Sequence, residues 1–209
     1  MRMSLKEKLV MHNVLKEGHF KLTSGKHSNW YINKDDIFSD HGLFTTVRDM
    51  ICVNLSLNWS HANYNIITGP AIAGAVLASS VATNLGMDFV YPEKVTKQII
   101  SPKSRMALDV PNGMEFRRGY DKKINNMNVV IVEDIITTGK SVNETIAAIK
   151  ECGGTPEKVI AIWNRTGWQA DDCPTDALIN ELVESWDKEY CPFCNILPLT
   201  DPKTGGVID

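Results

Sequence analysis

The sequence predicts an α/β protein built on a central parallel sheet that is flanked by helices. Between residues 64 and 163, apolar runs of strand length alternate with longer helical stretches, and this alternation is typical of a parallel sheet with helices packed on it. One run, residues 129–132, is apolar and β-branched without polar alternation, which indicates a strand buried on both faces. The turns that follow parallel strands meet at one edge of the sheet, where ligands bind in such folds.

The amino-terminal segment predicts a helix. Leu5, Leu9, Val14 and Leu15 recur at near-helical spacing, so we expect a helix over the first 16 or so residues, ended by Gly18.

Two short strands and a second helix are expected next. Strands at residues 20–22 and 30–33 flank the polar turn 24–28 and form a small hood. Asp40 then caps a helix from residue 41 to about residue 57. The remaining elements follow in chain order: a strand at 64–68, a helix at 72–85, strands at 88–91 and 129–133, a helix at 140–152 and a strand at 158–163.

The long polar stretch between Tyr91 and Asn128 is typical of a functional lid or of a disordered segment. Within it, residues 114–117 are expected to form a strand that returns the chain to the sheet. Near the carboxyl end, residues 176–186 fit either a further strand or a short helix, and the pattern does not decide between them.

The composition is that of an ordinary globular chain and argues against several function classes. The 209 residues are 43% hydrophobic and 22% charged, so we expect residues 1–209 to form a single domain. A net charge of −3 without a basic tail does not favour nucleic acid as a partner. There is no signal-peptide pattern, and the most apolar stretch, residues 71–82, is too short to span a bilayer. We therefore expect a cytoplasmic protein without a membrane partner.

Five cysteines are present, and Cys191 and Cys194 form a CxxC pair. A zinc site would need two further ligands at comparable spacing. Cys152 and Cys173 are scattered, and no histidine follows His61. The sequence therefore favours a cysteine pair without a metal, and a redox role is expected still less.

The most informative stretch is VVIVEDIITTGKS, residues 129–141. Glu133 and Asp134 stand at the carboxyl end of the buried strand, where two neighbouring carboxylates repel each other and gain from ribose hydroxyls or a metal-bound ligand. Residues 137–141 then place backbone N–H groups and hydroxyls at a helix start, where a phosphate monoester binds well. This order of residue types predicts a site for a sugar phosphate.

Each part of this stretch has a simpler interpretation. In this interpretation, Glu133 and Asp134 are polar residues at the point where the strand leaves the core, and Ser141 is an ordinary helix cap. The two features together, in this order, favour the ligand site. The GKS triplet suggests a nucleotide-binding P-loop, but that motif needs a glycine five positions before Gly139, where this chain has Asp134. We reject the P-loop.

Residues 129–141 resemble the phosphoribosyl-pyrophosphate signature of the type I phosphoribosyltransferases. Other segments resemble the orotate phosphoribosyltransferases within that family. GHFKLTSGKHSNWYINK at 18–34 is similar to their substrate hood, and ITGPAIAGAVLA at 67–78 is similar to their pyrophosphate loop. MEFRRGYDKK at 114–123, the arginine of WNRTG and the tail segment YCPFCNILPL are similar to one branch of these enzymes. The similarity runs in the same order over almost the whole chain.

The resemblance implies transfer of the 5-phosphoribosyl group from phosphoribosyl pyrophosphate to orotate, which gives orotidine 5′-monophosphate and pyrophosphate in pyrimidine biosynthesis. It implies Mg²⁺ as cofactor, held through phosphoribosyl pyrophosphate near Asp134 and not directly by the protein. It also implies a homodimer, a hood made by residues 18–36 and the C-terminal segment, and a mobile loop at about residues 92–113 that reaches the neighbour's site.

The resemblance assigns site residues by position. Lys94, Lys97 and Thr137 are expected to be catalytic. Phosphoribosyl pyrophosphate is expected to bind the acid pair, the turn after it, a loop of small residues and two arginines, namely Glu133, Asp134, Thr137, Thr138, Gly139, Lys140, Ser141, Gly69, Pro70, Ala71, Ile72, Ala73, Gly74, Arg117 and Arg118. Orotate is expected to bind Ser24, Lys26, Tyr31, Ile32, Thr137 and Arg165. By residue type alone, the lysines would be solvated charges, and the arginines would flank an edge strand or form surface ion pairs.

Two other functions stay open at this point. The same transfer chemistry would serve a purine base or uracil, and the choice of orotate depends on the resemblance. A protein that senses phosphoribosyl pyrophosphate without catalysis is the other alternative, although no segment resembles a DNA-binding appendage.

Overall fold

The computed structural model describes residues 3–22, 24–58, 64–100 and 107–208. Contacts divide the chain into two compact units, one of Met1–Val47 with Glu181–Asp209 and one of Arg48–Asn180. We call them the terminal unit and the central unit and describe each by itself. No helix in these described ranges is both long and apolar enough to cross a membrane.

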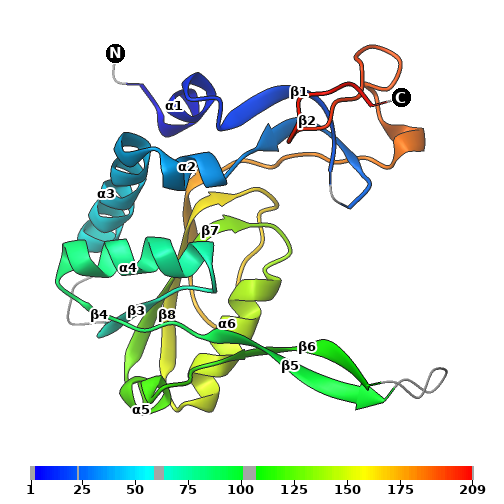
Figure 1. The fold of residues 1–209 in the computed structure, drawn as a ribbon. Helices are drawn as coiled ribbons and strands as arrows, with labels where there is room; N and C mark the ends of the chain where they lie inside the picture. Colours follow the sequence, from blue (N-terminus) through cyan, green and yellow to red (C-terminus); the bar gives the residue numbers. More distant parts are fainter. Residues whose placement is uncertain (1–2, 23, 59–63, 101–106, 209) are drawn as a thin grey trace. The chain divides into compact units, whose positions relative to one another are not determined.

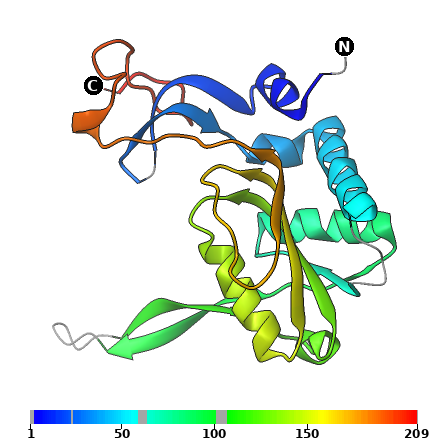
Figure 2. The same cartoon turned by 180° about the vertical axis from the view of Figure 1, so that it is seen from behind.

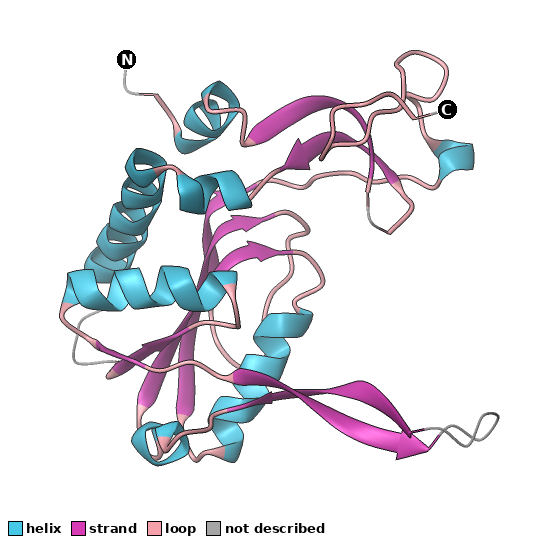
Figure 3. Ribbon diagram, viewed as in Figure 1, coloured by secondary structure: helices cyan, strands magenta, loops and turns pink. Residues whose placement is uncertain are grey.

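The central unit is built on a five-stranded parallel sheet, as the alternation predicts (Figures 1 and 3). The strands lie in the order β4 (Asp88–Phe89), β3 (Ile66–Thr68), β7 (Asn128–Ile136), β8 (Thr155–Asn164) and β9 (Thr175–Asn180). All neighbouring pairs are parallel. Figure 2 shows the same sheet from behind, with β9 beside β8. The undecided stretch at 176–186 therefore begins as an edge strand.

Helices cover this sheet and bury the β-branched runs. α4 (Ala73–Leu85) packs on β3, β4 and β7, and α6 (Lys140–Glu151) packs on β7 and β8. Residues 129–132 of β7 are fully buried, which explains their lack of polar alternation. The short α5 (Tyr120–Ile124), which the sequence pattern did not indicate, precedes β7 and buries Ile124.

The expected loop at 92–113 is largely an antiparallel hairpin of β5 (Glu93–Ile100) and β6 (Ala107–Glu115), which extends away from the sheet in Figure 1. Residues 101–106 of that loop lie outside the described residues. The prediction that residues 114–117 return the chain to the central sheet is wrong, because Met114 pairs with Lys94 and Glu115 with Glu93. A strand this close in sequence satisfies the backbone groups of β6 without the central sheet.

The terminal unit contains α1 (Leu5–Met11), the antiparallel pair β1 (Leu15–Lys21) and β2 (His27–Ile32), and the short helices α2 (Asp35–Ser39) and η1 (Lys188–Tyr190). α3 (His41–Asn58) begins here with the Asp40 cap that the sequence predicts, since the Leu43 N–H donates to Asp40 Oδ1 at 2.9 Å. The prediction of a helix to residue 16 is wrong. Asn13 has a φ of 57° and ends the helix, and Leu15 is buried in β1 instead.

The C-terminal segment lies along the β1–β2 hairpin. Trp186 exchanges two backbone hydrogen bonds of 2.8 Å with His27, and the Thr200 N–H donates to the His19 carbonyl at 2.8 Å. These contacts bring Cys191 and Cys194 beside two histidines from the other end of the chain. The argument that the cysteine pair lacks two further ligands is therefore wrong, because it counted only ligands close to the pair in sequence.

Candidate functional site

The acid pair lies inside strand β7, and both carboxylates are buried. Glu133 is 5% exposed and Asp134 is 3% exposed. Glu133 Oε1 accepts the Asp134 N–H at 2.9 Å, and Glu133 Oε2 accepts the Ser141 hydroxyl at 2.7 Å. Asp134 Oδ1 accepts the Ile135 N–H at 2.6 Å. Glu133 Oε2 therefore holds the start of α6 against the end of β7, and Oε1 bonds within β7 itself.

Burial, followed by the charge of the neighbouring Asp134, raises the pKa of Glu133 to about 8, although the hydrogen bonds from Ser141 and from the Asp134 N–H oppose the shift. A carboxyl whose charged form is desolvated beside another carboxylate keeps its proton. With a pKa of about 8, Glu133 is mostly protonated and uncharged at neutral pH.

The turn after β7 requires glycine at position 139. Gly139 has a φ of +69°, and a Cβ there would lie 2.1 Å from the Trp168 ring. Only glycine adopts this conformation cheaply and leaves room for the indole. The turn thus exposes backbone at the start of α6, at the positive end of the helix dipole.

A cavity of about 410 Å³ opens over this turn. Two segments line it, the end of β7 with the start of α6 and the base of the β5–β6 hairpin, namely Lys94, Val95, Thr96, Pro111, Gly113, Ile135, Ile136, Thr137, Thr138, Gly139, Lys140, Ser141, Val142 and Glu144. The five predicted phosphate-binding residues of the turn therefore share one cavity with the predicted catalytic Lys94. Lys97 is also on β5, but it is exposed and does not line this cavity.

The predicted pyrophosphate loop packs against the same strand end. A Cβ on Gly69 would lie 2.6 Å from the Val132 carbonyl oxygen, and a Cβ on Gly74 would lie 2.8 Å from Glu133 Oε1. Small residues are therefore required where this loop meets β7. Between them, Pro70 is buried, Ala71 and Ala73 are half-buried, and Ile72 is 80% exposed.

Arg165 follows β8 in a turn that is hydrogen-bonded to the end of β7 and to the turn 137–141, which we call the phosphate turn because a phosphate is predicted to bind there. The Arg165 N–H donates to the Ile136 carbonyl at 3.2 Å, and the Thr166 hydroxyl donates to the Thr137 carbonyl at 2.6 Å. Burial lowers the pKa of the Arg165 guanidinium. Within the described part of the chain, no carboxylate forms an ion pair with it. A half-buried guanidinium of this kind favours an anionic ligand.

Three other predicted cations, Arg117, Arg118 and Lys140, are already paired with acids of the chain. Arg117 lies 3.0 Å from Glu115, and Arg118 lies 2.6 Å from Glu93. The hydrogen bond with Glu93 raises the pKa of Arg118. Lys140 lies 3.8 Å from Glu144 in the first turns of α6. These three contacts are exposed or partly exposed, so each pair is weak and its cation can exchange partners.

The predicted hood residues belong to the terminal unit. Ser24 and Lys26 are exposed in the β1–β2 turn, where Lys26 Nζ lies 3.7 Å from Asp187. Tyr31 and Ile32 end β2 and are half-buried, and the Tyr31 ring lies 5.9 Å from the Phe20 ring. Burial, followed by the charge of Asp35, raises the pKa of Tyr31.

Sequence reasoning missed Trp168 as a part of this site. Its ring fills the space beside Gly139, and its carbonyl accepts the Asn164 side-chain amide at 2.7 Å. The aromatic residue three positions after Arg165 is visible in the sequence, but no spacing rule connects it with a glycine 29 positions earlier.

Known proteins resemble this chain in sequence over most of its length. Residues 51–172 match the family model described as the phosphoribosyl transferase domain. The chain is 31% identical over 191 residues to the orotate phosphoribosyltransferase of Thermoanaerobacter sp., covering 90% of each chain. It is 31% identical over 206 residues to that of Thermotoga maritima, covering 97% of this chain and 99% of the relative.

Solved structures share the fold at lower identity. Orotate phosphoribosyltransferase from Aeropyrum pernix superimposes with a TM-score of 0.60 at 19% identity, covering 84% of this chain and 92% of that one. Adenine phosphoribosyl transferase from Trypanosoma brucei, solved with AMP, pyrophosphate and ribose-5-phosphate, gives a TM-score of 0.61 at 19% identity, covering 84% of this chain and 78% of that one. Fold similarity alone therefore does not separate one base from another.

Proposed function

Because this chain belongs to the phosphoribosyltransferase family, and within it to the orotate phosphoribosyltransferases, we propose that it joins orotate to the phosphoribosyl group of phosphoribosyl pyrophosphate. The products are orotidine 5′-monophosphate and pyrophosphate, as a step of pyrimidine synthesis. The main observation behind this proposal is that residues 137–141 and Lys94 line the same cavity.

The cavity suits both the 5′-phosphate and the pyrophosphate group of phosphoribosyl pyrophosphate. In the reaction the bond between C1 of the ribose and the pyrophosphate oxygen breaks, and the oxygen leaves with the electron pair. A ring nitrogen of orotate bonds to C1 as its N–H bond breaks, and the proton passes to solvent or to the leaving pyrophosphate. Backbone N–H groups of residues 137–141, at the start of α6, hold the 5′-phosphate. Lys94 neutralises the charge that grows on the leaving pyrophosphate. The protein contributes positioning and electrostatics rather than a covalent intermediate.

Mg²⁺ is part of the proposal. A hard cation prefers carboxylate, phosphate and water oxygens, and the donor set at the end of β7 fits such an ion through Asp134. Glu133 is the weaker candidate, since both of its oxygens accept hydrogen bonds within the protein and its pKa is raised to about 8. When bound, the ion would neutralise pyrophosphate oxygens and stabilise the leaving group. Asp134 would act on it through water or through the substrate.

Arg165 is our candidate for the orotate carboxylate. It follows β8 on the turn that is hydrogen-bonded to Thr137, so a base held there would lie next to the phosphate turn. A planar guanidinium binds a carboxylate with two parallel, charge-assisted hydrogen bonds, and neither uracil nor a purine base carries a carboxylate. Ser24, Lys26, Tyr31 and Ile32 are proposed to complete the base site from the hood.

The remaining parts of the proposal concern the assembly. We propose a cytoplasmic homodimer in which the β5–β6 hairpin, with Lys97 on its exposed part, reaches toward the site of the second chain as a lid. Arg117 and Arg118 lie just after β6 and would exchange Glu115 and Glu93 for pyrophosphate oxygens when the substrate is bound. Neither of these roles is needed for the transfer chemistry described above.

Turnover with different bases tests the proposal. Protein, Mg²⁺ and phosphoribosyl pyrophosphate are mixed separately with orotate, uracil, hypoxanthine and adenine, and the absorbance change of each base is followed. We expect product from orotate. Product from uracil or a purine with none from orotate would reject the proposed substrate, and binding of phosphoribosyl pyrophosphate without turnover of any base would support a sensor instead.

A further inference from the structure

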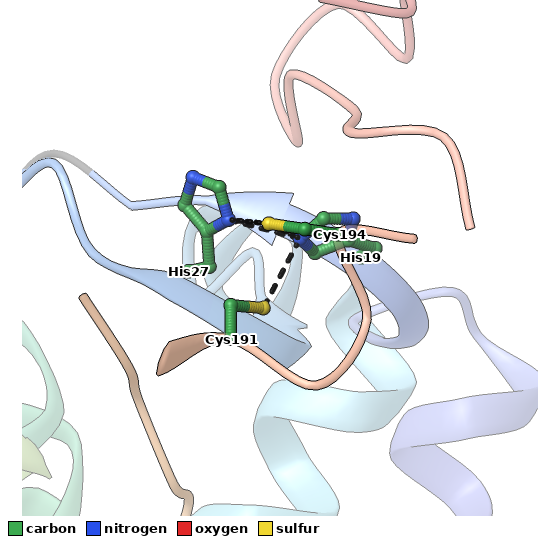
Figure 4. Close-up of side chains that lie close together, drawn as sticks. All are labelled: His19, His27, Cys191 and Cys194. Carbon is green, nitrogen blue, oxygen red and sulfur yellow. Dashed lines mark hydrogen bonds between the residues drawn. The ribbon is translucent and has the colours of Figure 1, made fainter. Parts of the chain in front are cut away.

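Four side chains in the terminal unit converge on one point, and the proposed transfer reaction uses none of them. They are His19 on β1, His27 at the start of β2, and Cys191 and Cys194 in the C-terminal segment (Figure 4). One possible ligand atom from each residue lies within 4.8 Å of all the others. We propose that these four residues bind a structural zinc ion.

The distances between the ligand atoms are close to the edges of a tetrahedron. His19 Nε2 lies 3.0 Å from His27 Nδ1 and 3.4 Å from Cys191 Sγ. Cys194 Sγ lies 3.2 Å from His27 Nδ1 and 3.9 Å from His19 Nε2. Zinc bonds of about 2.0–2.1 Å to nitrogen and 2.3 Å to sulfur in a tetrahedral site place neighbouring ligand atoms about 3.3–3.8 Å apart. Small shifts of the side chains bring all four atoms to bonding distance.

The surroundings orient His19 as a metal ligand. His19 Nδ1 lies 3.0 Å from the Leu197 carbonyl oxygen, and a carbonyl only accepts, so Nδ1 carries the proton and Nε2 presents its lone pair to the cluster. A backbone carbonyl behind a histidine ligand is a usual outer partner in zinc sites. The hydrogen-bonding pattern of His19 therefore fits a metal better than it fits a solvated imidazole.

Three of these four side chains are buried, unlike those of a cysteine pair on a protein surface. His19 and His27 are each 2% exposed, and Cys191 is 9% exposed. Cys194 is half-buried. Two histidines and two cysteines form the donor set of closed structural sites, which leave no position for water. The thiols give up their protons to solvent as the metal binds, so two thiolates balance the charge of Zn²⁺.

The zinc ion would join the two ends of the chain. His19 and Cys191 are 172 positions apart, and the backbone bonds of His27 with Trp186 and of His19 with Thr200 flank the cluster. Apart from the metal, the tail is held to the hairpin by these few bonds and by ring contacts such as His19 with Phe193 at 6.3 Å. Metal binding that closes such a long loop contributes directly to the stability of the folded unit.

Metal analysis of the full-length protein tests this inference independently of the transfer reaction. The protein is purified without chelators under reducing conditions, supplied with zinc, and its metal content and intact native mass are measured. We expect about one zinc per chain. We also expect Co²⁺ in its place to give a thiolate-to-metal charge-transfer absorption, which requires cysteine ligands.

Substitutions identify the ligands. Cys191→Ser, Cys194→Ser and His19→Ala should each weaken zinc binding by more than about 100-fold, beyond the loss typical of outer partners. Cys152→Ser is the matched control, since Cys152 lies at the end of α6 in the central unit, and it should keep full zinc content. If a ligand variant does not fold, native mass spectrometry of the unmodified protein still decides.

Three outcomes would overturn the inference. The first is an unmodified protein that binds no zinc when the metal is supplied. The second is a mass that is two hydrogens lower, which indicates a Cys191–Cys194 disulfide in place of the metal. The third is equal loss of zinc from Cys152→Ser and from the ligand variants.

Discussion

The Ser141 hydroxyl donates a 2.7 Å hydrogen bond to Glu133 Oε2, so the first turn of α6 is fixed to a buried carboxyl of β7. Glu133 also accepts the Asp134 N–H and lies against Gly74 of the adjacent loop. One carboxyl therefore positions both loops that the proposed reaction needs, and its role is to support the site more than to contact the ligand.

Glu133→Gln should remove a pH dependence of stability. The pKa of Glu133 is raised to about 8 in the folded protein by burial, whereas the unfolded value is about 4.3. The folded state therefore binds the proton more tightly, so its contribution to stability is complete below about pH 4 and is lost as pH rises through about 8. Glutamine keeps the neutral shape: its carbonyl oxygen accepts one hydrogen bond, and its NH2 group donates to the Ser141 hydroxyl, which then accepts instead of donating.

Urea unfolding of Glu133→Gln and of the unmodified protein from pH 5 to pH 9 measures this difference. The variant should gain stability relative to the unmodified protein as pH rises. A constant difference across this range would show that Glu133 does not keep its proton.

Lys94→Ala should lower kcat by about 100-fold or more with a smaller change in the KM for phosphoribosyl pyrophosphate, because the charge matters most as pyrophosphate departs. Lys97→Ala tests the proposed lid in the same assay, and Lys123→Ala, on exposed α5, is the control. Unchanged kcat in Lys94→Ala would remove this residue from the mechanism.

Gly139→Ala should disrupt the phosphate turn. Its left-handed φ of +69° costs about 1–2 kcal/mol for alanine, and the contact of 2.1 Å with Trp168 adds to that cost. Gly86→Ala is a matched control, because Gly86 has a φ of +67° and open space around it. Thermal unfolding and binding of phosphoribosyl pyrophosphate are measured for both, and equal losses in the two variants would show that the Trp168 contact is unimportant.

Arg165→Lys should raise the KM for orotate by about 10-fold or more, since lysine keeps the charge but not the two parallel hydrogen bonds. The KM for phosphoribosyl pyrophosphate should change little. Steady-state kinetics with each substrate varied separately checks this, and equal increases in both KM values would indicate that Arg165 supports the fold of the turn instead.

Local patterns predicted the central unit well. The parallel sheet, α4, α6 and the Asp40 cap follow from apolar runs, turn residues and capping chemistry that lie close together in sequence. The predicted and observed boundaries differ mainly where a strand continues beyond its run of apolar residues. β7, for example, extends through the acid pair to Ile136.

What the sequence did not show depends on contacts between distant segments. The helix predicted to residue 16 was wrong because Leu15 is buried equally well in strand β1, and Val14 is buried just before that strand. Trp168 beside Gly139 and His19 beside Cys191 are tertiary contacts without a spacing rule. The sequence placed Glu133 and Asp134 at the strand end. It could not predict that both are buried or that Glu133 accepts hydrogen bonds within the protein.

A crystal structure of the protein with orotidine 5′-monophosphate tests the central claim most directly. The account predicts that the phosphate oxygens lie about 3 Å from backbone nitrogens of residues 138–141, with the base carboxylate on the Arg165 guanidinium. A phosphate bound away from residues 137–141 would contradict it.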